Sequence, residues 1–209
     1  YDKSDYAATE PLFKKYHAYS EKMYSLAPNS FNSIMELSYS HNSLGSLYLK
    51  QFNYTGAKQR FTESLALKKE ALELKPNNKN LLRDKADTIS WIAKTEERLG
   101  NFNAALTMYG NVSNELKSLL IEYPADASLL SDLANAFIQK SYLFSYLPNK
   151  KNAYNYAMQA TKAINNARLQ DPKSKEFQRA YYRFLAHQLV LSPNKNVDNR
   201  VKDIINFMK

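Results

Sequence analysis

Three histidines, His17, His41 and His187, are the side chains of this sequence best suited to acid–base or metal chemistry. They are far apart in the sequence, and no HExxH motif, glycine-rich phosphate loop or nucleophile elbow accompanies them. The chain has no cysteine, which excludes disulfides, thiol catalysis and thiolate metal sites. We interpret His41 as a packed structural histidine. The sequence therefore predicts a protein that is not an enzyme and has neither a cofactor nor a metal site.

Neither the acidic pair nor the charged run of this sequence is predicted to be catalytic. Glu96 and Glu97 are adjacent, so on a helix their carboxylates point in different directions and cannot act as a catalytic pair. The run Lys68–Glu70 and the following Glu73 have the spacing of ion pairs between successive helical turns. We interpret this spacing as surface chemistry.

The composition is typical of a folded helical protein. The chain has 209 residues, of which 44% are hydrophobic and 23% charged, and this length suits one domain or a short repeat array. Glycine is rare, which favours helices. No apolar run approaches the length of about 18 residues that a membrane span needs. The first residue is Tyr1 and no leader peptide is visible, so the compartment stays undetermined, with the cytoplasm as our working expectation.

Four prolines mark an internal repeat. They are 48 residues apart, and a residue type that commonly caps helix N-termini follows each of them by two positions. Because proline cannot continue a helix, one helix should stop and another should start at each point. The prolines are Pro28, Pro76, Pro124 and Pro172, and the predicted caps are Ser30, Asn78, Asp126 and Ser174.

Small and aromatic residues recur with the same period. Small residues at fixed places let two helices approach closely, and large neighbours fill the space between hairpins. One small column is Ala57, Ala105 and Ala153, a second is Gly45, Ala93 and Ser141, and an aromatic column begins with Phe61 and Tyr109 and reaches Ala157.

The period predicts an all-α array over residues 1–191. It comprises a helix over 9–26, hairpins over 30–75, 78–123 and 126–171, and a helix over 174–191. A capping helix is expected over 192–209. Thr9 is the predicted cap of the first helix, with Pro11 in its first turn. This helix has the register of the second half of a hairpin, so we expect the native protein to extend N-terminally, the alternative being an N-terminal capping helix.

Two segments resemble the tetratricopeptide repeat. His41-x-x-Leu44-Gly45-x-x-Tyr48 with Ala57-x-x-x-Phe61 is similar to one whole motif, and Gly100-Asn101-Phe102-x-x-Ala105-x-x-x-Tyr109 is similar to its second half. The sequence departs from the family in its 48-residue period, against about 34 in the family, and in its third unit, where Lys140 and Ala157 occupy motif positions. The resemblance implies a right-handed α-solenoid of antiparallel hairpins with about three and a half repeats.

The resemblance also implies a concave groove lined by the first helix of each hairpin. The repeat register then gives a partner-binding groove of twelve residues. Co-chaperone repeats bind a C-terminal carboxylate with Lys and Arg side chains in such a groove. Amides stand at the comparable positions of this sequence, so we interpret the carboxylate clamp as absent. Ile138 is a further candidate for this groove. For Trp91 and Ile138, the alternative to facing the groove is to be packed inside the array. The twelve are Tyr39, Asn42, Ser46, Trp91, Lys94, Arg98, Asn135, Gln139, Tyr142, Tyr146, Arg183 and His187.

These features predict a scaffold or recognition module, part of a larger protein, that binds a protein or peptide segment in the groove. Lys94, Arg98 and Arg183 favour an acidic partner. A self-assembling structural module is the first alternative, and the oligomeric state is left open. Nucleic acid is less favoured: most of the +9 charge lies in residues 151–209, but its basic residues are scattered.

Overall fold

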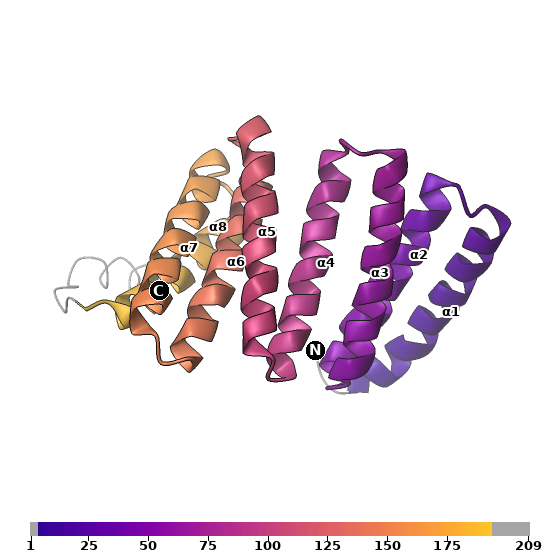
Figure 1. The fold of residues 1–209 in the computed structure, drawn as a ribbon, viewed down its shortest axis with the longest axis horizontal. Helices are drawn as coiled ribbons and strands as arrows, with labels where there is room; N and C mark the ends of the chain where they lie inside the picture. Colours follow the sequence, from indigo (N-terminus) through magenta and orange to yellow (C-terminus); the bar gives the residue numbers. More distant parts are fainter. Residues whose placement is uncertain (1–3, 194–209) are drawn as a thin grey trace. The chain divides into compact units, whose positions relative to one another are not determined.

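The computed structural model describes the backbone of residues 4–193 and the side chains of residues 9–193. Within residues 4–193 the chain forms eight α-helices and no strand (Figure 1). The predictions of an all-α chain and of a helical repeat are confirmed. The capping helix predicted over 192–209 lies almost wholly outside the described residues.

The helix boundaries follow the 48-residue period of the sequence. The first helices of the three hairpins each span 20 residues, and the second helices each span 21. They are α2 (Phe31–Lys50) and α3 (Tyr54–Leu74), α4 (Lys79–Arg98) and α5 (Phe102–Glu122), and α6 (Ala127–Tyr146) and α7 (Lys150–Gln170). The first helix, α1, spans Ser4–Leu26, and the last, α8, spans Lys175–Leu191.

Three of the four predicted N-caps accept a backbone hydrogen bond through their side chains. Asn78 accepts from the N–H of Leu81, and Asp126 and Ser174 do the same for α6 and α8. Ser30 occupies the cap position of α2 without such a bond. Near Ser30, the hydroxyl of Ser33 donates to the Ser30 carbonyl oxygen.

The turns inside the hairpins differ because three different residues occupy one repeat position. Phe52 and Gly100 both adopt a positive φ, 62° and 83°, in the turns that follow α2 and α4. Glycine reaches this region without steric cost, whereas phenylalanine does not. Pro148 is the equivalent residue after α6, and its ring fixes φ at a negative value. The third turn therefore follows a different path.

The first helix begins earlier than the sequence predicts. Helix α1 starts at Ser4, so Thr9 lies within it and is not its cap, and Pro11 lies inside the helix. Proline lacks an N–H and removes one backbone bond from the helix. Here the helix continues through it, which shows that a proline is not sufficient to place a helix start.

The chain divides into two compact units, residues 1–108 and 109–209, with the division inside α5. The sequence predicts one array over 1–191 and gives no sign of this division. Each unit is described by itself below.

In the first unit, neighbouring helices from α1 to α4 pack side by side in sequence order (Figure 1). One buried cluster joins α2, α3 and α4 through Ile34, Leu67 and Leu81. A second cluster forms around Phe61, with Ala57 and Ile92. Gly45 lies directly against this phenylalanine, because a Cβ built on the glycine would lie 2.8 Å from the Phe61 ring. Gly45, the first of the small residues that recur every 48 positions, therefore marks a close approach of α2 and α3.

In the second unit, α7 packs against both α6 and α8. The contact face of α7 is built largely of alanines, including Ala153, Ala157 and Ala160, all with no exposed surface. Leu129 and Leu143 of α6 and Phe184 of α8 are likewise fully buried. Small side chains on one helix thus accommodate large ones on its neighbours.

Candidate functional site

The first unit contains a hollow of about 540 Å³ between the facing surfaces of α1, α2 and α4. Its walls come mainly from α2 and α4, the first helices of two successive hairpins, and α1 contributes Met23. The lining residues are Met23, Phe31, Asn32, Met35, Glu36, Tyr39, Asn78, Asn80, Leu81 and Asp84. Amides, carboxylates and apolar side chains thus share one cavity.

Tyrosine hydroxyls fix both carboxylates of the hollow. The Tyr16 hydroxyl donates to Glu36 Oε2 at 2.8 Å, and the Tyr39 hydroxyl donates to Asp84 Oδ2 at 3.0 Å. Burial, together with the bonded carboxylates, raises the pKa of each tyrosine to about 12. Both hydroxyls therefore stay protonated at neutral pH and remain donors.

A buried lysine lies next to the hollow, where the sequence predicts a surface residue. Lys68 has only 2% of its surface exposed, so its assignment to a solvated face was wrong. Its ammonium donates to Thr88 Oγ1 at 2.7 Å and to the Asp84 backbone oxygen at 3.1 Å, and lies 5.7 Å from the centre of the Tyr39 ring. Burial lowers the pKa of Lys68, and the nearby Asp84 and Asp87 oppose this. Lys68 is buried because α3 packs against α4, and the sequence of α3 alone does not indicate this contact.

Six of the predicted groove residues lie in the first unit. Tyr39 lines the hollow, and Asn42 reaches from α2 to Thr88 of α4 at 3.4 Å. Trp91 is 38% exposed and stacks on Phe61 with 5.8 Å between ring centres, so it is both packed and accessible. The other three are Ser46, which is half-buried, Lys94, which pairs with Glu97 at 2.8 Å, and Arg98, which is exposed.

The other six lie in the second unit. The structure brings Tyr142 of α6 and His187 of α8 together, with ring centres 4.4 Å apart, and His187 Nε2 lies 2.9 Å from Ser141 Oγ. Burial lowers the pKa of His187. Asn135, Tyr146 and Arg183 are exposed and Gln139 is half-buried, whereas Ile138 is buried and belongs to the core.

A cluster of histidines in the first unit was not predicted, because its members are distant in the sequence. The rings of His17 and His41 meet edge to face with 4.5 Å between their centres. Arg60 Nη1 lies 3.3 Å from His17 Nε2 and 3.4 Å from His41 Nδ1, and Glu63 Oε2 lies 3.0 Å from His41 Nδ1. Ser40 Oγ lies 2.9 Å from His17 Nδ1. Helices α1, α2 and α3 therefore meet at a polar, titratable core, and His41 is buried there.

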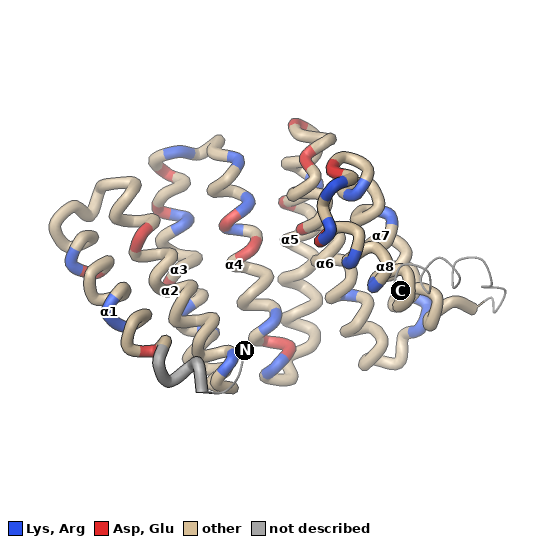
Figure 2. Tube along the Cα trace, turned by 180° about the vertical axis from the view of Figure 1, so that it is seen from behind, with Lys and Arg blue, Asp and Glu red and all other residues tan. Residues whose placement is uncertain are grey.

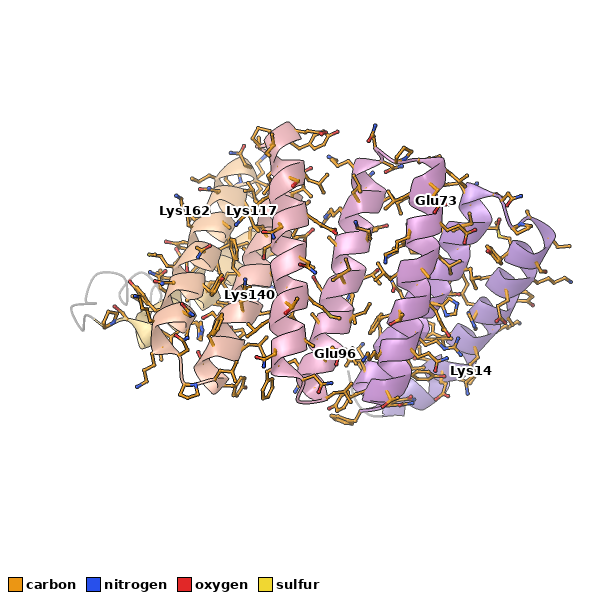
Figure 3. The ribbon with its side chains drawn as sticks, viewed as in Figure 1. Lys14, Glu73, Glu96, Lys117, Lys140 and Lys162 are labelled. Carbon is orange, nitrogen blue, oxygen red and sulfur yellow. The ribbon has the colours of Figure 1, made fainter. Side chains whose placement is uncertain are left out.

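Glu96 and Glu97 point to different partners. Glu96 is buried and pairs with Lys58 of α3 at 2.7 Å, and it also accepts a hydrogen bond from Asn101 at 2.7 Å (Figure 3). Burial raises the pKa of Glu96, but these two bonds outweigh burial and hold it below its usual value. Glu97 pairs with Lys94. Glu96 therefore fastens α4 to α3, whereas the pair of Glu97 with Lys94 lies within α4.

Charge is distributed differently in the two units. Acidic and basic residues are mixed along α3 and α4, whereas Lys and Arg outnumber Asp and Glu along α7 and α8 (Figure 2). Several cations of the second unit lie on its aromatic rings. Lys140 Nζ lies 4.2 Å from the centre of Tyr156 and Arg168 lies 4.5 Å from that of Tyr181 (Figure 3 labels Lys140).

Within the described side chains, no group of three or more His, Cys, Asp and Glu residues is arranged to hold a metal ion. None of the described helices combines the length and the apolar character that crossing a membrane requires.

No protein-family model matches the chain, and no curated protein matches it in sequence. A solved structure is similar: BtubC (BKLC) from P. vanneervenii, with a TM-score of 0.56 and 12% sequence identity. The alignment covers 97% of this chain and 89% of that chain. The likeness is one of fold. At this identity it supports the all-α helical-repeat architecture and carries no information about function.

Proposed function

We propose that this chain is a non-enzymatic interaction module with a right-handed, tetratricopeptide-like arrangement of hairpins, and that it binds a partner segment in the hollow of the first unit. The observation that carries the proposal is the hollow itself. It lies on the first helices of two successive hairpins, which are the elements expected to form the binding face, and it is lined by amides, carboxylates and accessible aromatic and apolar side chains.

The side chains of the hollow suit the recognition of a peptide. The amides of Asn32 and Asn80 are exposed and offer both donors and acceptors to a peptide backbone. Tyr39 is 40% exposed and held by Asp84, so it presents a rigid aromatic surface with little entropy left to lose on binding. Fixed aromatic side chains of this kind recur among the residues that contribute most to binding energy.

Self-assembly is the second candidate function, and a specific surface supports it. Leu12, Tyr19 and Leu26 of α1 are each more than 60% exposed and recur every seven residues. This spacing places them along one side of a helix, as in helices that pair with a second helix. A second copy of the chain could cover this face.

Nucleic-acid binding remains the less favoured alternative. Its support is the basic character of α7 and α8. The contact of Arg168 of α7 with the Tyr181 ring weighs against it, because this cation is already engaged within its own unit.

A photo-cross-linker placed in the hollow tests the proposal. We expect Asn80→p-benzoylphenylalanine to give a discrete cross-linked product in host lysate, because this exposed position lines the hollow. The same substitution at Thr62, an exposed position of α3 outside the hollow, is the matched control and should give none. Excess wild-type protein without the cross-linker should compete for the partner and suppress the product, whereas excess Tyr39→Ala protein should not.

Equal yields from positions 62 and 80, or no product at either, would contradict the proposal. Substitution at Tyr19 addresses self-assembly in the same experiment. A cross-link from that position to a second copy of the chain would favour the structural module.

A further inference from the structure

We infer that the hollow of the first unit receives a Lys or Arg side chain of an extended partner segment. The inference rests on the proposed function and adds the chemical class of the ligand. It differs from the acidic partner that the sequence favours, because the lysines and arginines behind that expectation do not line the hollow.

The charge of the lining carries the first step. Among the described residues, those that line the hollow include two carboxylates, Glu36 and Asp84, and no Lys, Arg or His. They come from two different helices and face the same cavity of about 540 Å³. Complementary charge both steers a partner to a site and excludes partners of the wrong sign. A cationic side chain is the group that this lining complements.

The second step is the positioning of the carboxylates. Each accepts one hydrogen bond from a tyrosine hydroxyl, Glu36 from Tyr16 and Asp84 from Tyr39. A carboxylate offers about four acceptor positions, so one such bond leaves capacity for an ammonium or guanidinium group. Because the tyrosines already hold both groups, binding costs little reorganisation.

The third step concerns the apolar part of the hollow. Lysine and arginine carry their charge at the end of an apolar stem, and they bury that stem against apolar surface. Met23, which is 41% exposed, and the half-buried Phe31 supply such surface in the same cavity as the carboxylates. Lys75 Nζ lies 3.7 Å from the centre of the Phe31 ring, so one face of this ring already holds a cation of the protein itself.

The buried Lys68 does not occupy this place. Its ammonium donates to the backbone oxygen of Asp84 and to the hydroxyl of Thr88. The carboxylate of Asp84 instead accepts its hydrogen bond from Tyr39. It is 2% exposed and is not among the residues that line the hollow.

Selection from a phage-displayed library of random peptides tests the inference. We expect peptides selected on the wild-type protein to share a Lys or Arg at one position. Replacing that residue in a synthetic peptide by the uncharged norleucine or citrulline should weaken binding at least about tenfold. This comparison needs only the wild-type protein.

Charge-removing variants locate the effect. In Glu36→Gln/Asp84→Asn, the amide oxygens can still accept the tyrosine bonds, so the fold should persist and the preference for the basic residue should disappear. Glu70→Gln is the matched control, because Glu70 also accepts a tyrosine hydroxyl, that of Tyr24, but does not line the hollow. It should retain the preference.

The outcomes separate the two proposals. Selected peptides that cross-link from position 80 but show no basic preference would overturn the ligand class and leave the interaction function standing. A basic preference that persists in Glu36→Gln/Asp84→Asn, or that Glu70→Gln removes equally, would also overturn the inference. If no selected peptide cross-links from position 80, both proposals fail.

Discussion

Gly45→Ala is expected to destabilise the first unit by about 1–3 kcal/mol, the usual cost of overpacking a core. In an ordinary helix interior the same change stabilises by about 1 kcal/mol, so the expected sign is reversed. The reason is that the new Cβ would lie 2.8–3.0 Å from three atoms of the Phe61 ring. That ring is fully buried and stacks on Trp91, and its displacement would disturb both.

Fluorescence of Trp91 during urea unfolding measures this effect, because it is the only tryptophan of the chain and belongs to the first unit. Phe61→Leu provides the control. It should cost less in the Gly45→Ala background than in the wild type, since the smaller side chain makes room for the methyl group. Increased stability of Gly45→Ala, or strictly additive effects, would contradict the close contact of α2 with α3.

Acid is expected to destabilise the first unit through His41. Burial, with smaller contributions from His17 and Arg60, lowers the pKa of this histidine from 6.5 to about 4 against the opposing effect of Glu63. The folded pKa lies below the unfolded one, so between these values the unfolded chain binds more protons. The free energy of unfolding should therefore fall as the pH falls from 6.5 to about 4. At about 1.4 kcal/mol per unit, the loss approaches 3 kcal/mol.

Urea unfolding followed by Trp91 fluorescence at several pH values within this window measures the loss. His41→Gln keeps a polar neutral side chain and should remove most of the pH dependence. The other ionisable groups found against the histidines are Glu21, 3.4 Å from His17, Glu63, and Arg60, which contacts both rings. An NMR titration that gives His41 a pKa of 6 or higher would contradict the prediction, as would an unchanged pH dependence in His41→Gln.

The sequence was sufficient to predict the helices, because their signals are local. Caps such as Asn78 and Asp126 satisfy free N–H groups within one helical turn, and they recur at a fixed period. The alanine column proved a reliable marker, since Ala57, Ala105 and Ala153 have no exposed surface. The start of α1 was missed because Thr9 and Pro11 are residue types common at helix starts, whereas here both lie inside the helix.

The candidate site was less predictable, because contacts between helices create it. Only Tyr39 of the predicted groove residues lines the hollow. Its hydrogen bond to Asp84 crosses from α2 to α4, and nothing within either helix signals it. Lys68 and the pair of His17 with His41 were missed for the same reason. The repeat register offered a usable signal for Asp84, which stands 48 residues after Glu36.

A double-mutant cycle between the protein and its peptide is the most direct test of the binding proposed for the hollow. The dissociation constants of a selected basic peptide and of its norleucine counterpart are measured with the wild type and with Asp84→Asn. We predict a coupling energy of at least about 1 kcal/mol between the peptide cation and Asp84, as for other close charge pairs. Free energies that add to within about 0.3 kcal/mol would show that the cation does not bind at Asp84 and would contradict the proposal.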